Sequence, residues 1–346
     1  MTSMTDYYRV CPQVQVYHAL PDAIAPYVVF TARPDFRSDV VNTDGCGFRW
    51  SYNPSGEIVD SASWWRCSKR GIVLGGSFGF SFGATHDRYT LVSLLNSLSD
   101  YSFLNLGSRG ANSTQGLIAA IPFVSNSECV IVCSGINNLG ANFQSIGRYD
   151  LFGSFYYEHV YESLSSYKLL DLAGLVENST SKISSVSFLL KEMIRRVPLV
   201  FARHSQPDEL LLEQDFSIDD EAVERAFNLQ TRDLLMISKM IEKKTRLVFV
   251  TQPFADTMAK VLSPEEEMLF AISDSLQGQG WQTFKKQISA VWPQYVLRLQ
   301  SFCQYQGIQF FDLNSIQLNG WCFVDRTHMI DNGYSQVAEK IAKSLS

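Results

Sequence analysis

Five short apolar runs, rich in β-branched residues, constrain the fold of this chain more than any other feature. They end in small or polar residues and lie at 71–77, 102–108, 128–135, 245–253 and 307–314. A continuous apolar run suits a strand that is buried on both faces, as in parallel sheets. Helical spacing occurs between or after these runs, at 88–98, 113–121, 263–306 and 332–344. The alternation predicts a flavodoxin-like three-layer α/β/α sandwich with a five-stranded parallel sheet in the order 2-1-3-4-5.

Two segments do not fit this alternation. Residues 1–70 precede the first core strand, and we expect them to form an N-terminal extension packed on the core. Residues 139–244 separate the third and fourth strands by far more than a normal crossover. They are predicted to be a mostly helical insertion, because 182–196 and 219–243 have amphipathic spacing. The core domain would then cover 71–346, interrupted by the insertion.

Charge and composition exclude several classes of protein. The formal net charge is −6, with 29 Lys+Arg against 35 Asp+Glu, so a nucleic-acid partner is not expected. No apolar run approaches the 18 or so residues of a membrane-spanning helix. The start of the chain has no cationic and apolar leader pattern, and the seven cysteines form no CxxC pair. We therefore expect a cytoplasmic protein without a disulfide framework.

Cofactor and metal sites are not predicted either. The sequence contains no GxxxxGK[ST] and no GxGxxG motif, so nucleotide binding lacks support. His18, His159 and His204 have no partner at the spacing of metal ligands. His86 and Asp87 could line a pocket, but a surface cap to the helix that starts near Arg88 is the more typical role. We expect no cofactor and no metal.

The first predicted strand ends in a serine flanked by glycines, Gly75-Gly76-Ser77-Phe78-Gly79. Glycines permit a tight turn and close approach of a substrate, and a helix that follows presents backbone N–H groups to negative charge. A serine at this junction is a candidate nucleophile. Turns of this composition also occur where they only reverse the chain or bind a phosphate.

Two further positions follow the neighbouring strands. The second strand ends at Gly107, and Asn137 follows the third. Because the order 2-1-3 places both strands beside the first, these residues should meet near Ser77. A backbone N–H at Gly107 and the amide of Asn137 are donors of the type that an oxyanion hole needs. The alternative is plain turn chemistry, which both residue types favour.

A histidine and an aspartate lie close together before the C-terminal helix, in Val324-Asp325-Arg326-Thr327-His328. His328 could accept the proton of the Ser77 hydroxyl, while Asp325 orients the imidazole ring. A lone histidine is more often structural. The aspartate at a spacing of three residues favours the catalytic interpretation here.

These four segments together resemble the SGNH hydrolases, the GDSL-type esterase superfamily. The resemblance covers about 71–138 and 245–345, and its blocks occur in the family's order. It implies Ser77 as nucleophile, Gly107 and Asn137 as oxyanion donors beside the Ser77 N–H, and His328 with Asp325 as the other triad members. Two departures are Gly76 and Asn138, where the family often has aspartate. Both leave the implied triad intact but weaken assignment to a lipase-like subfamily.

The glycines around Ser77 also fit the GxSxG elbow of the α/β-hydrolases. That fold places several strands before its nucleophile and usually carries its acid and histidine on separate loops. Ser77 instead ends the first clear core strand, and Asp325 lies beside His328. The SGNH resemblance is therefore the better match.

The resemblance implies a serine esterase that removes a small acyl group, acetyl in the first instance, from an acylated substrate such as a carbohydrate. One alternative is an O-acyltransferase that uses the same site to acylate a sugar hydroxyl. A second is a carbohydrate-binding protein without catalysis. The sequence makes no prediction of oligomeric state.

Overall fold

The computed structural model describes residues 3–25, 28–143 and 220–345. The chain divides into two compact units, Met1–Phe155 with Phe216–Ser346, and Tyr156–Asp215. The features described below all belong to the first unit. Most of the predicted insertion, including the helix expected at 182–196, lies outside the described residues, and the predicted domain boundaries stay a prediction.

The central sheet has five parallel strands in the order β6-β5-β7-β8-β9. The strands are β5 (Arg70–Gly75), β6 (Ser102–Gly107), β7 (Cys129–Ser134), β8 (Arg246–Thr251) and β9 (Gln309–Phe311). This is the predicted order 2-1-3-4-5. Gly75 of β5 pairs with Gly107 of β6 and with Cys133 of β7, so these three strands end level with one another. β9 is shorter than the predicted run and only half-buried.

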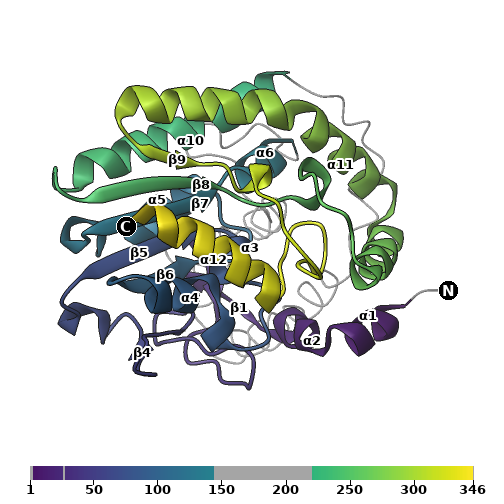
Figure 1. Cartoon of the computed structure of the whole chain (residues 1–346), viewed down its shortest axis with the longest axis horizontal. Coiled ribbons are helices and arrows are strands. Elements are labelled where there is room, and N and C mark those ends of the chain that lie inside the picture. Colours follow the sequence, from purple (N-terminus) through teal and green to yellow (C-terminus); the bar gives the residue numbers. More distant parts are fainter. Residues whose placement is uncertain (1–2, 26–27, 144–219, 346) are drawn as a thin grey trace, which may run out of the picture. The chain divides into compact units, whose positions relative to one another are not determined.

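Helices cover both faces of the sheet and make the predicted three layers (Figure 1). On one face, α4 (Leu91–Leu98) packs beside α12 (Asp331–Leu345). The helices associated with the other face are α5 (Ser113–Ala120), α6 (Ile136–Phe143), α10 (Asp220–Met240) and α11 (Pro264–Gln306). Successive side chains of a strand point to opposite faces of the sheet. Ile72 and Leu74 pack in the hydrophobic cluster that includes α10 and α11, whereas Val73 packs in the cluster that includes α4 and α12. Burial on both faces explains why the strands read as continuous apolar runs.

The predicted helices at 219–243 and 263–306 correspond to α10 and α11. α11 begins at a capping box, in which the Ser263 hydroxyl accepts from the Glu266 N–H and the Glu266 carboxylate accepts from the Ser263 N–H. It ends at Gly307, whose φ of 68° lies in the left-handed region. Within the described ranges, no helix is both long and apolar enough to cross a membrane.

The described residues before β5 form two short α-helices, two hairpins and the 3-10 helix Trp64–Arg66. The α-helices and hairpins are α1 (Met4–Val10), α2 (Pro12–Ala19), the antiparallel pair β1 (Asp22–Ala25) and β2 (Val29–Ala32), and the pair β3 (Ser51–Tyr52) and β4 (Ile58–Val59). Tyr7 and Tyr17 of the two helices belong to the same buried cluster as Phe80, Phe82 and Val324. The segment therefore packs against the loops at the carboxyl edge of the sheet.

Candidate active site

Ser77 is the first residue of α3 (Ser77–Phe80), directly after β5. The two glycines before it are required by close contacts. A Cβ atom at Gly75 would lie 2.7 Å from the Cys133 carbonyl oxygen, and one at Gly76 would lie 2.0 Å from Asn137 Nδ2. The strand can therefore turn into the helix only if these positions carry no side chain.

His328 and Asp325 meet Ser77 although 248 or more residues of chain separate them. His328 Nε2 lies 2.7 Å from Ser77 Oγ, and His328 Nδ1 lies 2.7 Å from Asp325 Oδ2. The three groups thus form the hydrogen-bonded line that a serine nucleophile, a general base and an orienting carboxylate require.

Asp325 is held in place by its own loop. Its Oδ1 atom accepts from the backbone N–H groups of Thr327 and His328, each at 2.8 Å, and from the Thr327 hydroxyl at 3.0 Å. Burial opposes ionisation of the carboxyl, but the charge of His328 and these hydrogen bonds outweigh it, so the pKa of Asp325 lies below its ordinary value of 3.8. The carboxylate is therefore ionised at neutral pH and aimed at the imidazole.

The imidazole of His328 also has an aromatic neighbour. The Phe82 ring lies against it, with ring centroids 4.3 Å apart and planes 34° apart. Phe82 belongs to the loop that follows α3. The face of the histidine is thus fixed by packing while its edge is fixed by Asp325.

Asn137 lies beside the nucleophile turn, as expected. Its Nδ2 atom donates to the Ala111 carbonyl oxygen over 2.8 Å and occupies the space that a side chain at Gly76 would fill. An amide nitrogen has two N–H bonds, so one remains beside the turn after the bond to Ala111. Asn137 is buried at the start of α6.

Gly107 does not have the expected free N–H group. Its N–H donates to the side-chain oxygen of Asn105 over 2.9 Å, and a Cβ atom at this position would lie 2.2 Å from the Phe80 nitrogen. Gly107 is therefore a close-packing position between β6 and α3. An N–H that is already occupied does not fit the oxyanion role that the sequence suggested.

A second glycine in the same loop was missed by the sequence analysis. Gly110 has a φ of 69°, within a turn closed by the Ala111 N–H bonding to the Ser108 carbonyl over 3.2 Å. The Gly110 N–H has no hydrogen bond with any described residue. Ala111, the next residue, is the one that Asn137 binds. The signal available in the sequence was the second glycine of Gly107-Ser108-Arg109-Gly110.

A buried polar network fixes this loop from behind. The Asn138 side chain bonds to both the N–H and the hydroxyl of Ser113, at 2.9 Å and 2.7 Å. The hydroxyls of Ser113 and Thr114 then donate to Asp233 Oδ2 of α10, at 2.6 Å and 2.7 Å. Asn138 thus anchors the start of α5 next to the loop that carries Gly110.

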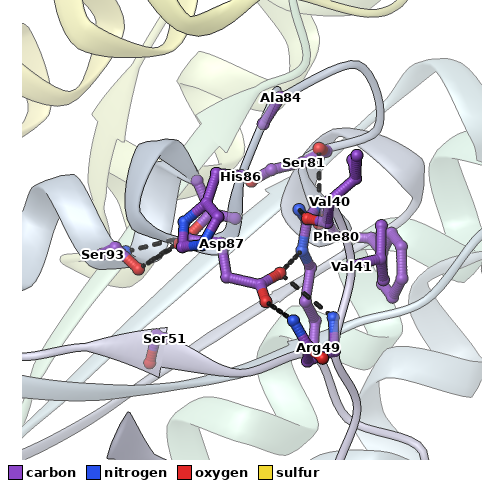
Figure 2. Close-up of polar contacts among 12 residues, drawn as sticks. Val40, Val41, Arg49, Ser51, Phe80, Ser81, Ala84, His86, Asp87 and Ser93 are labelled. Carbon is purple, nitrogen blue, oxygen red and sulfur yellow. Dashed lines mark hydrogen bonds and ion pairs between the residues drawn. The ribbon is translucent and has the colours of Figure 1, made fainter. Parts of the chain in front are cut away.

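The C-terminal end of α3 is held by an arginine from the segment before the sheet (Figure 2). Arg49 Nη1 donates to the carbonyl oxygens of Phe80 and Ser81, at 3.0 Å and 2.8 Å. Its Nε atom donates to Asp87 Oδ1 over 2.7 Å. α3 has only four residues, and the chain leaves it through a left-handed Ser81 with φ of 63°. The guanidinium therefore supplies donors to carbonyls that a longer helix would satisfy itself.

The roles of His86 and Asp87 differ. His86 Nδ1 accepts from the Arg88 N–H over 3.0 Å, so it caps the short 3-10 helix Asp87–Tyr89. The α-helix predicted from about Arg88 begins later, at Leu91, and its cap is Thr90. Asp87 is completely buried against Arg49 rather than at the surface. The prediction of a surface position was wrong for Asp87, because nothing local in the sequence pairs it with an arginine 38 residues earlier.

The loop of His328 is tied to α11 through Arg326. The Arg326 guanidinium binds Asp274, with Nη2 at 2.7 Å from Oδ2, and also binds Asp256. Lys285 Nζ adds a second cation at 2.6 Å from Asp274. Burial raises the pKa of Asp274, but hydrogen bonds from Arg326, Lys285 and Trp281 outweigh it and lower this pKa to about 2. The ion pairs therefore hold the loop at neutral pH.

No known family model matches this chain, and no curated protein matches it either. Solved structures do match. An extracellular lipase from Streptomyces rimosus is 12% identical with a TM-score of 0.41, over 81% of this chain and 100% of that one. A carbohydrate acetylesterase from Sinorhizobium meliloti is 10% identical with a TM-score of 0.40, over 80% and 98%.

A family two carbohydrate esterase from Clostridium thermocellum, in complex with cellohexaose, is 9% identical with a TM-score of 0.41, over 84% of this chain and 67% of that one. The five parallel strands lie in the order predicted from the alternation of strands and helices, and Ser77, Asn137, Asp325 and His328 lie together at one edge of this sheet.

Proposed function

We propose that this protein is a serine esterase that removes a small acyl group, acetyl in the first instance, from an acylated carbohydrate. The observation that carries the proposal is the line of two 2.7 Å contacts from Ser77 Oγ through His328 to Asp325. Each side chain is fixed independently, by the turn of α3, by Phe82 and by the loop of Asp325. Such an arrangement is suited to nucleophilic acyl transfer.

In the first half-reaction, Ser77 Oγ attacks the ester carbonyl carbon while its proton moves to His328 Nε2. The tetrahedral oxyanion is stabilised by the N–H groups of Ser77 and Gly110 and by Asn137 Nδ2. Its collapse breaks the ester C–O bond, and the leaving alkoxide takes the proton from His328. Asp325 stabilises the imidazolium that exists between these transfers.

In the second half-reaction, water attacks the acyl-enzyme with His328 as base. The carboxylic acid leaves, and Ser77 regains its proton. The net reaction is hydrolysis of one ester to one acid and one alcohol, and it needs no cofactor. Gly110 replaces Gly107 in this scheme because the Gly107 N–H is already bonded to Asn105.

The test is hydrolysis of acetylated sugars and of phenyl acetate by the wild-type chain and by Ser77→Ala. We expect turnover by the wild type, loss of nearly all of it in the variant, and covalent labelling of Ser77 by a fluorophosphonate. Retention of most activity by Ser77→Ala would refute the proposal. Adding an acceptor alcohol distinguishes hydrolysis from transfer, since a transferase would form a new ester at the expense of free acid. Absence of labelling in folded protein would favour the non-catalytic alternative.

A further inference from the structure

His18 of α2 and the proposed catalytic His328 both contact the ring of Phe82. The His18 and Phe82 rings have centroids 5.8 Å apart, and the Phe82 and His328 rings have centroids 4.3 Å apart. The charges of Asp325 and His328 both act on His18, which is consistent with this proximity. His18 is exposed to solvent. It therefore lies at the rim of the site with a side chain that a substrate can reach.

One edge of the His18 ring is occupied and the other is free. The Tyr8 hydroxyl lies 2.9 Å from His18 Nδ1, while Nε2 has no partner among the described residues. The protein atoms around this exposed ring partly desolvate it and lower its pKa, although the charge of Asp325 acts in the opposite direction, so the neutral form is favoured at neutral pH. We assign the proton of the neutral ring to Nε2, so that Nδ1 accepts from the Tyr8 hydroxyl. His18 thus presents an uncharged N–H donor.

α2 is fixed to the loops that surround Ser77, which gives this donor a defined position. Gln13 Nε2 donates to the Gly83 carbonyl over 3.1 Å, and the Tyr17 hydroxyl donates to the Ala84 carbonyl over 2.7 Å. Both acceptors lie in the loop that follows α3. Arg109, from the loop of Gly110, donates to the Tyr17 carbonyl over 2.8 Å. The helix is therefore attached both to the loop that follows α3 and to the loop that carries Gly110.

The neighbouring charge does not favour an anionic substrate here. Arg109 binds Asp22 and the carbonyl oxygens of Tyr17 and Leu20, so both its Nη atoms are already engaged. What remains at this rim is the neutral donor of His18 beside the partly buried Tyr8 ring. A pyranose or furanose ester matches this combination, because it offers oxygen acceptors together with apolar C–H faces.

We propose that His18 and Tyr8 form a sugar-binding subsite, in which His18 Nε2–H donates to a ring or substituent oxygen of the carbohydrate next to the ester that Ser77 attacks. This inference rests on the proposed esterase function and extends it, by assigning carbohydrate recognition to the segment before the sheet. His18 is then a specificity-determining residue of the reaction.

The test compares glucose pentaacetate with phenyl acetate. His18→Ala lowers kcat/KM for the sugar ester about tenfold more than for phenyl acetate, as expected for one lost hydrogen bond. His18→Gln, which keeps an N–H donor on a side chain of similar reach, restores part of the difference. Gln15→Ala is the matched control, since Gln15 is exposed on the same helix and makes no described contact. An equal fall on both esters, or no fall on either, would overturn the proposal.

A binding measurement separates this inference from the esterase function. Glucose pentaacetate is titrated into Ser77→Ala and into Ser77→Ala/His18→Ala, with detection by NMR. We expect about tenfold weaker binding in the double variant. If no ester is hydrolysed by the wild type, the esterase proposal fails while this comparison still decides the subsite. If Ser77→Ala does not bind the sugar, or both variants bind it equally, the subsite is refuted while hydrolysis of phenyl acetate would leave the esterase intact.

Discussion

Arg49 and Asp87 form an ion pair that is closed to solvent, with Arg49 Nε 2.7 Å from Asp87 Oδ1 and neither side chain exposed. Arg49 belongs to the segment before the sheet, and its Nη1 atom donates to the backbone carbonyls that end α3 (Figure 2). Asp87 also accepts from the N–H and the side-chain amide of Asn42. The pair thus joins the N-terminal segment to the helix that carries Ser77.

Removing one partner of this ion pair is expected to destabilise the folded protein strongly. Arg49→Met leaves the Asp87 carboxylate buried without its cation, so the free energy of unfolding should fall by about 3–5 kcal/mol. Urea denaturation followed by circular dichroism measures it. Lys69→Met is the control, because Lys69 pairs with Asp100 at the surface over 3.5 Å and should change stability by at most about 1 kcal/mol. Equal effects of the two substitutions would contradict the structural role given to Arg49.

Asn137 is predicted to act on the transition state rather than on the fold. Asn137→Ala removes one oxyanion donor and should lower kcat on phenyl acetate by roughly 10²–10³. Its KM should change little, since the oxyanion exists only after attack. Steady-state kinetics gives both parameters. A large increase in KM with an unchanged kcat would show that Asn137 binds the ground state instead.

The roles of Gly107 and Gly110, which lie in the same loop, can be distinguished by replacing the hydrogen-bond partner of Gly107. Asn105→Ala removes the acceptor of the Gly107 N–H, which leaves that N–H buried without a partner and should destabilise the protein by about 1–3 kcal/mol. If Gly110 supplies the oxyanion N–H, kcat on phenyl acetate should change far less than in Asn137→Ala. A parallel thermal melt measures stability. A kcat loss as large as that of Asn137→Ala would indicate that Gly107 takes part after all.

Asp325→Asn tests the orientation of His328. The amide cannot stabilise the imidazolium as a carboxylate does and can hold the ring in the wrong tautomer, so kcat should fall by on the order of 10³–10⁴. The measurement is kcat on phenyl acetate at neutral pH. Because the hydrogen bonds from Thr327 and His328 N–H can still reach the remaining carbonyl oxygen, the thermal midpoint should move little. Activity close to that of the wild type would refute the triad role of Asp325.

The ion pairs of Asp274 make the free energy of unfolding depend on pH in the acidic range. Its pKa in the folded protein is about 2, below the ordinary 3.8, so its contribution is present above pH 4 and is lost as pH falls through about 2. A shift of this size corresponds to about 2 kcal/mol. Urea unfolding at several pH values should therefore show a slope between pH 4 and 2 that Asp274→Asn reduces. An unchanged slope in this variant would show that other carboxyl groups carry the acid sensitivity.

Much of the site could be predicted because several of its residues directly follow predicted strands. The runs around Ile72, Phe103 and Ile131 are apolar on both faces, and such runs leave little choice of element or of position in a parallel sheet. Once their order is set, Ser77 and Asn137 must lie at the same edge. Asp325 and His328 were found because their spacing of three residues in one loop is itself a chemical signal.

Other residues could not be assigned from local pattern. Gly107 and Gly110 lie three apart in one loop, and only the contact with Asn105 decides which N–H is occupied. Arg49 and His18 carry no motif, and their significance comes from contacts with Phe80 and Phe82, which are distant in the chain.

The one-dimensional pattern of apolar runs and turn residues thus determined the sheet, its strand order and four of the five proposed site positions, because strand burial and loop chemistry are encoded over a few neighbouring residues. Tertiary structure alone decided which backbone donors stay free, which cation holds α3 and which side chains reach the rim of the site. Which backbone donors stay free depends on the direction of individual N–H bonds, and the roles of Arg49 and His18 depend on partners that lie tens of residues away in the chain.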